Sequence, residues 1–149
     1  MVIHSATKYL GGHSDILAGT VCGSHELISS IKKSGLNFGS NISEYVAWLL
    51  ERSIKTLSVR VLKQNDNALK VALFLSGHKL INKVYYPGLE KHEKHNIAKD
   101  QMNGGFGGMV SFELNDNMNS DDFVKSLKVV QPTMSCLLYT SPSPRDGLL

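Results

Sequence analysis

Lys8 is the residue in this chain whose surroundings best suit covalent chemistry. It follows a short apolar run at residues 1–3 and lies in a segment rich in hydroxyl groups and glycine, residues 4–15. A lysine that is partly desolvated at the end of a strand loses its proton more readily and becomes a nucleophile toward carbonyl groups. Nearby hydroxyl groups and backbone amides would bind phosphate, so an aldehyde cofactor that carries a phosphate fits this combination. The hydroxyl groups nearest in the chain belong to Ser5, Thr7 and Ser14. Spacing alone favours an ordinary solvated loop lysine over this chemistry.

Two other groups of residues could suggest a site, and neither has the required pattern. The glycine run at 104–108 precedes a predicted strand, whereas nucleotide-binding loops follow a strand and open a helix. Gly11 and Gly12 lack the third glycine and the lysine of a phosphate loop. The clustered histidines are His78, His92 and His95. They lack the four spaced ligands of a structural zinc site, so we predict a solvated charged loop and no metal.

Composition excludes several classes of protein. The chain has 149 residues, 42% hydrophobic and 19% charged, with a formal net charge of +3. That charge is too small and too scattered to predict nucleic-acid binding. The sequence has no apolar run of about 20 residues and no secretory signal pattern, so we expect no membrane segment. Two cysteines cannot build a disulfide framework, which favours the reducing cytoplasm.

The elements expected to position Lys8 are of the α/β type. Residues 1–3 and 16–23 are apolar and β-branched, which is typical of buried strands in a parallel sheet. Ser24 is a suitable N-cap for a helix after the second strand, and Gly35 could end it with a left-handed residue. Strands alternating with a helix indicate an α/β architecture.

The strongest periodicity predicts a long helix in the middle of the chain. Asn41, with Glu44 three residues later, resembles a capping box, so this helix should begin near Ile42. The apolar stripe pauses at 64–67, resumes, and stops at Gly77. The stripe consists of Val46, Leu50, Ile54, Leu57 and Val61. The aromatic residues expected to pack near it are Tyr45 and Trp48.

Beyond Gly77 the pattern restarts as a smaller α/β unit. We expect strands at 81–86 and 109–114, a turn at Pro87-Gly88, a helix at 97–102, a helix capped by Ser120, and a further strand starting at 128–130.

The segment from His4 to Asp15 resembles the cofactor-lysine motif of the Cys/Met-metabolism family of pyridoxal-phosphate enzymes, which act in transsulfuration. Its sequence is His-Ser-Ala-Thr-Lys-Tyr-Leu-Gly-Gly-His-Ser-Asp. Other stretches resemble the same family in the same order, namely 47–60, 84–89 and 105–114. The similarity extends over residues 1–135.

The resemblance implies roles for four residues. Lys8 would bind pyridoxal 5'-phosphate as an imine and shuttle protons at the substrate's carbon atoms. Ser5 and Thr7 match phosphate-binding hydroxyls, and Ser135 matches a serine near the substrate carboxylate. The reaction would be β- or γ-elimination, or γ-replacement, on a small amino acid such as cystathionine or O-acylhomoserine. The family implies a homotetramer, a dimer of dimers.

The resemblance also predicts that the chain is a fragment of a fold-type-I, aminotransferase-like enzyme. Residues 1–39 would end the large cofactor domain, 40–76 form the connecting helix, and 77–135 belong to the C-terminal domain. Residues 136–149 are expected to be non-native, because 136–146 resembles the out-of-frame translation of a sequencing adapter. The cofactor contacts that the family places elsewhere would lie before Met1 and after Ser135, so we expect the isolated chain to be inactive and poorly stable.

Two alternatives remain at this point. Within the enzymes, the parent could be an O-acylhomoserine sulfhydrylase or a methionine γ-lyase. In a different class, the chain could be a non-catalytic binding or assembly module with Lys8 as a surface lysine.

Overall fold

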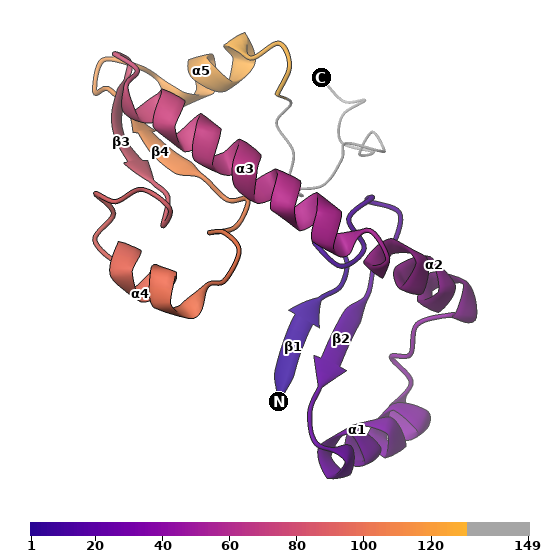
Figure 1. Cartoon of the computed structure of the whole chain (residues 1–149). Helices are drawn as coiled ribbons and strands as arrows, with labels where there is room; N and C mark the ends of the chain where they lie inside the picture. Colours follow the sequence, from indigo (N-terminus) through magenta and orange to yellow (C-terminus); the bar gives the residue numbers. More distant parts are fainter. Residues whose placement is uncertain (131–149) are drawn as a thin grey trace. The chain divides into compact units, whose positions relative to one another are not determined.

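The computed structural model describes residues 1–130, which fold into two units. The first comprises Met1–Leu57, and the second begins at Ser58. Figure 1 shows the strands β1 and β2 in the first unit and β3 and β4 in the second. Each unit therefore has its own small sheet and its own apolar cluster.

The first sheet is antiparallel, and this corrects the predicted buried parallel strands. β1 (Val2–Ser5) pairs with β2 (Gly19–Cys22), in a register that runs from Val2 opposite Cys22 to Ser5 opposite Gly19. All four residues of β1 are exposed. The loop at 6–18 returns the chain directly beside β1, whereas a parallel pair would need a crossover on a sheet face. Burial was also predicted wrongly, because β1 is exposed throughout and no residue of β2 is fully buried.

Helix α1 (His25–Phe38) is capped by Ser24 as predicted, and it continues past the expected end. The left-handed residue is Gly39, with φ of 80°, and its N–H donates to the carbonyl of Gly35. Gly35 is therefore an interior helical residue. α1 has no buried side chain.

The single long helix predicted from the periodicity is two helices, α2 (Glu44–Ile54) and α3 (Leu57–Ser76). The helix is interrupted just after Ile54, the last residue of α2. There the Ser53 carbonyl accepts from Thr56 N–H at 3.2 Å and from the Thr56 hydroxyl at 3.1 Å. These bonds span three residues, which tightens the backbone out of the α-helical ladder. α3 runs without a break through 64–67, and it ends before Gly77 as predicted.

The cap and the aromatic residues of α2 also differ from the prediction. Ser43 is the N-cap, and its hydroxyl accepts from Val46 N–H at 3.3 Å. Asn41 instead donates its side-chain amide to the carbonyl of Gly35 at 3.2 Å. The aromatic pair lies on the surface rather than in the core, with ring centroids 6.1 Å apart. Its exposed fractions are 65% for Tyr45 and 55% for Trp48.

The second unit pairs β3 (Ile81–Tyr85) with β4 (Ser111–Leu114), again antiparallel. The other elements are the short helices α4 (His95–Gln101) and α5 (Ser120–Ser126). The core cluster of this unit consists of Ala68, Ala72 and Tyr86. Most predicted elements of this half exist, with small shifts at their ends.

Two details of the second unit contradict the sequence-based expectations. Asn119, not Ser120, caps α5, because its side-chain oxygen accepts from the N–H groups of Asp121 and Asp122. Residues 128–130 form bends rather than a strand. A strand requires a paired neighbour, and none of the described residues pairs with this segment.

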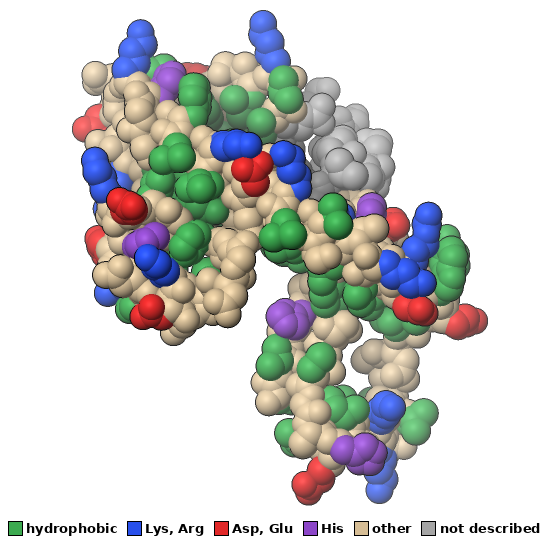
Figure 2. All heavy atoms as spheres, viewed as in Figure 1, with side chains coloured by type: hydrophobic (Ala, Val, Ile, Leu, Met, Phe, Trp, Pro, Cys, Tyr) green, Lys and Arg blue, Asp and Glu red, His purple; other side chains and the backbone are tan. Residues whose placement is uncertain are grey.

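Many large apolar side chains reach the surface of both units, as Figure 2 shows. Within residues 1–130, no helix is long and apolar enough to cross a membrane.

Candidate active site

Lys8 lies in a tight turn that starts where β1 ends. Its own N–H donates to the carbonyl of Ser5 at 3.2 Å, and its carbonyl accepts from Gly12 N–H at 2.7 Å. Gly11 N–H donates to the carbonyl of Ala6, also at 2.7 Å. The backbone on both sides of Lys8 is thus held by local hydrogen bonds, and its side chain is half-buried.

The turn is closely packed against an apolar cluster. Ala6 is fully buried and contacts Ile16 and Leu50, of which Leu50 comes from α2. A Cβ atom at Gly11 would lie 2.8 Å from the Ala6 carbonyl oxygen and 2.9 Å from the Ile16 side chain. Only glycine fits there, because real Cβ atoms do not approach other atoms so closely.

Thr7 closes the loop at its base. Its N–H and its hydroxyl both donate to the carbonyl of Ala18, at 3.1 and 3.3 Å, and its hydroxyl oxygen accepts from Ala18 N–H at 2.9 Å. Sequence reasoning predicted a phosphate-binding role for Thr7 and missed this structural one. Nothing in the local sequence signals it, because the partner lies 11 residues away and is bound through its backbone.

The residues around Lys8 fit a phosphorylated aldehyde. The Lys8 amine is the group that could bind an aldehyde carbon, and Ser5, the last residue of β1, presents an exposed side chain beside it in the chain. The Thr7 hydroxyl has one hydrogen, and its bond to the Ala18 carbonyl is long at 3.3 Å. To bind an oxyanion, the hydroxyl would have to turn this hydrogen away from the Ala18 carbonyl, while the Thr7 oxygen could keep its bond from Ala18 N–H.

His13 and Ser53 belong to this site, although the sequence analysis did not single them out. His13 Nδ1 lies 2.7 Å from the Gly11 carbonyl oxygen and 3.5 Å from the hydroxyl of Ser53. Ser53 is buried on α2, 40 residues further along the chain. No sequence signal could have paired residues so far apart.

The predicted solvated histidine loop is partly packed in the structure. His95 Nδ1 lies 2.8 Å from the Pro87 carbonyl oxygen, and its ring lies against Phe106, with centroids 5.4 Å apart. In the part of the chain that the structure describes, no three His, Cys, Asp or Glu side chains are placed to hold a metal ion.

The glycine run before β4 is a turn, as predicted, and Asn65 of α3 holds it. The Asn65 side chain donates to the Gly104 carbonyl at 2.9 Å and accepts from Gly107 N–H at 3.1 Å. The φ angles of Gly104, Gly105 and Gly107 are all positive, which favours glycine. The run is therefore a backbone turn pinned by an amide rather than a nucleotide loop.

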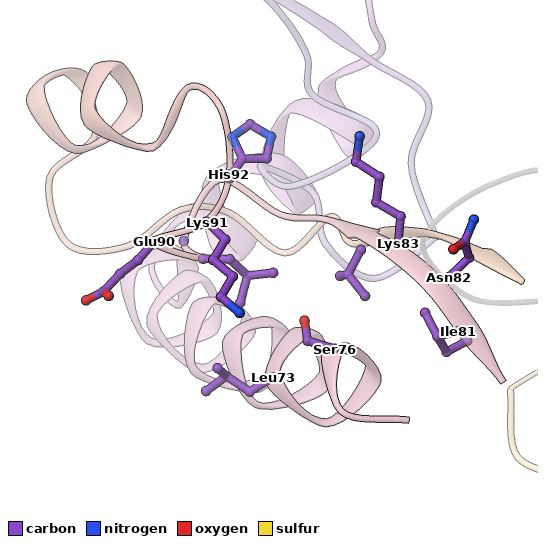
Figure 3. A pocket seen from close by; sticks show the side chains of 11 residues that line it. Leu73, Ser76, Ile81, Asn82, Lys83, Glu90, Lys91 and His92 are labelled. Carbon is purple, nitrogen blue, oxygen red and sulfur yellow. The ribbon is translucent and has the colours of Figure 1, made fainter. Parts of the chain in front are cut away.

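The second unit contains a hollow of about 650 Å³ between α3, β3 and the segment after it. Figure 3 shows Leu73 and Ser76 on α3 and Ile81, Asn82 and Lys83 on β3 around it. Of the predicted site residues that the structure describes, Ser5, Thr7 and Lys8, none lines this hollow, so the candidate active site is the Lys8 turn.

Comparison with known proteins decides the family. Residues 1–138 match the family described as Cys/Met metabolism PLP-dependent enzyme. The chain belongs to this family. The suspected relationship is thus confirmed, and the match reaches three residues beyond Ser135.

Two relatives of this Cys/Met-metabolism chain are named a cystathionine synthase and a cystathionine lyase. It is 46% identical over 130 residues to cystathionine gamma-synthase 1, chloroplastic, of Arabidopsis thaliana, covering 87% of this chain and 23% of that protein. It is 50% identical over 128 residues to cystathionine beta-lyase of Lactococcus lactis subsp. cremoris (strain MG1363), covering 85% and 33%. The chain therefore spans about a quarter to a third of the length of these relatives.

A solved structure confirms the fold of the Cys/Met-metabolism chain. The cystathionine gamma-lyase of Lactobacillus plantarum, crystallised with L-serine, superposes with a TM-score of 0.84 at 41% identity. The match covers 89% of this chain and 35% of the other. The predicted α/β fragment of the fold shared by these pyridoxal-phosphate enzymes is confirmed, and its antiparallel pairs are part of that fold. Ser135 and the predicted tail at 136–149 lie outside the described residues.

Proposed function

We propose that this chain is part of a pyridoxal-phosphate-dependent enzyme of transsulfuration that carries out β- or γ-elimination, or γ-replacement, on sulfur amino acids. Cystathionine and O-acylhomoserines are the proposed substrates. The supporting observation is the position of Lys8, half-buried on a turn whose backbone is held on both sides. Family membership supplies the cofactor that such an amine would bind.

The cofactor, Lys8 and the two hydroxyl residues have separate roles in the proposed reaction. When bound, pyridoxal phosphate supplies an electron sink for negative charge that develops on a substrate carbon. The Lys8 amine would hold the aldehyde group, and its Nζ atom, when free, would carry a proton to or from the substrate. Ser5 and Thr7 would donate hydroxyl hydrogens to the phosphate oxygens, which would orient the cofactor relative to Lys8.

Ser135 is proposed to contact the substrate carboxylate, which rests on the motif alone. The relatives' names include a synthase and a lyase, so they support the general chemistry and leave the choice of reaction open. We keep O-acylhomoserine sulfhydrylase and methionine γ-lyase as alternative activities. Incubating the full-length enzyme with cystathionine, O-succinylhomoserine plus sulfide, and methionine separates these activities by their products.

The remaining proposals concern the parent enzyme's assembly and compartment. We propose a homotetramer, with no nucleic-acid or membrane partner, and the cytoplasm as its location. The free, exposed Cys22 thiol is in keeping with a reducing compartment. The chloroplastic plant relative makes an organelle the alternative, which cell fractionation would test.

The experiment that tests the proposed function is covalent trapping. The full-length protein is incubated with pyridoxal phosphate, reduced with borohydride, digested, and mapped by mass spectrometry. We expect the cofactor's mass on Lys8, and its loss in Lys8→Arg. Lys55→Arg is the control, since Lys55 is an exposed lysine of the same unit. Recovery of the label equally on many lysines, with no preference for Lys8, would favour the alternative that the chain is a non-catalytic binding module.

A further inference from the structure

His13 stands between two residues whose backbone is left-handed. Gly12 has φ of 77° and Ser14 has φ of 59°. A non-glycine residue in this region persists only where its surroundings hold it, and such residues gather at functional sites. Between these two residues, the His13 ring is folded back so that Nδ1 lies 2.7 Å from the Gly11 carbonyl oxygen.

This bond determines the tautomer of His13. A carbonyl oxygen only accepts, so the hydrogen of the bond must be on Nδ1. His13 thus acts here as a donor, and the relevant nitrogen is Nδ1 rather than Nε2.

The bond completes the support of the Gly11 peptide unit. Gly11 is buried, its N–H donates to Ala6, and its carbonyl accepts from His13. The next N–H, that of Gly12, donates to the carbonyl of Lys8 itself. Since a buried carbonyl without a partner is costly, loss of the His13 bond would loosen the peptide that holds Lys8.

α2 contributes to the same arrangement. The Ser53 hydroxyl lies 3.5 Å from His13 Nδ1, and Leu50, one turn earlier, packs on Ala6 under the turn. The ring therefore lies between the turn and a helix of the same unit.

We propose that His13 is a positioning residue for Lys8, acting through its Nδ1–H bond to the Gly11 carbonyl. The inference rests on the proposed function of Lys8. It assigns His13 no contact with cofactor or substrate.

A pair of variants isolates the nitrogen concerned. In His13→Asn the side-chain amide nitrogen can occupy the place of Nδ1, whereas in His13→Gln it reaches the place of Nε2. Both are made in the full-length enzyme. Hydrogen exchange of the peptide covering Gly11 and Gly12 is measured by mass spectrometry, together with the rate of borohydride-trapped cofactor on Lys8.

We expect His13→Gln to speed exchange of this peptide by about tenfold, the loss of one hydrogen bond, and to slow trapping on Lys8. His13→Asn should restore both to near the parent values. His25→Asn on α1 is the control, and it should change neither.

Equal exchange in His13→Gln and the parent, or no rescue by Asn relative to Gln, would overturn the proposal. The two readouts also separate the two ideas. If hydrogen exchange changes as expected in the two variants while no cofactor is trapped on Lys8 of the parent enzyme, the proposed function fails. The support of the turn by His13 then remains. If trapping on Lys8 occurs and exchange is unchanged, the role of His13 fails alone.

Discussion

At the scale of single residues, the candidate site is a lysine held by its neighbours in the chain. The residue types around Lys8 leave a surface lysine open, and it is the resemblance of residues 4–15 to the family's lysine motif that predicts its role. The contacts of Thr7 with Ala18 and of His13 with Gly11 could not be predicted, since they depend on how the backbone folds back. The sequence therefore predicts the candidate reacting group, and the structure shows which residues hold the turn around it.

Gly11→Ala tests how closely the turn is packed. The added methyl group would meet the Ala6 carbonyl oxygen and the Ile16 side chain, so we expect the free energy of unfolding to fall by about 1–3 kcal/mol. Urea unfolding of the full-length enzyme measures this. Gly19→Ala is the matched control, because its new Cβ atom would lie 3.9 Å from the His4 carbonyl oxygen, which is an ordinary van der Waals contact. An equal effect of both substitutions would contradict the packing argument.

At the scale of elements, periodicity predicted where most of the helices and strands lie. It did not predict where the helices end or how the strands pair. The stripe from Val46 to Val61 is real, yet the chain turns at Thr56, where neither proline nor glycine gives a signal. The strand at 16–23 was predicted to be buried because its residues are apolar, but burial depends on what covers a strand. Caps were misplaced by one or two residues at Ser43 and Asn119, since several adjacent side chains are suitable caps.

Asn65→Ala tests the link between α3 and the glycine turn before β4. Both side-chain bonds, to Gly104 and Gly107, would be lost, so we expect the free energy of unfolding to fall by about 1–3 kcal/mol. Amide exchange at Gly107 should accelerate as well. Asn67→Ala, an exposed position on the same helix, is the control and should leave both measurements unchanged. If Asn65→Ala changed neither the free energy of unfolding nor exchange at Gly107, the turn would hold its shape without the side-chain amide.

At the scale of the whole molecule, apolar side chains are abundant on the surface. α1 buries none of its residues, and Leu36 and Phe38 near its end are 82% and 87% exposed. In the relatives, this segment is embedded in a protein about three to four times longer. The surface of residues 1–130 therefore carries many apolar side chains that a stable isolated domain would bury, which supports the expectation that the chain is poorly stable alone.

The double substitution Leu36→Asp with Phe38→Asp tests this at the level of association. We expect the 149-residue chain to self-associate at micromolar concentration, and the variant to remain dispersed severalfold higher, because the exposed apolar area is removed. Sedimentation velocity over a concentration series measures it. The control is Ser29→Asp with Ser30→Asp, which adds the same charge on the same helix. If the control disperses the chain equally well, charge and not apolar area is responsible.

The hydrogen bonds between Thr7 and Ala18 close the loop that carries Lys8 into a compact unit. Its two ends are tied by these three bonds, and apolar side chains of α2 pack beneath it. These side chains are Leu50, Val46 and Leu49. A designed hairpin that copies these bonds and provides equivalents of the α2 side chains would display a lysine in the same way. The segment thus offers a template for small synthetic catalysts that capture aldehydes.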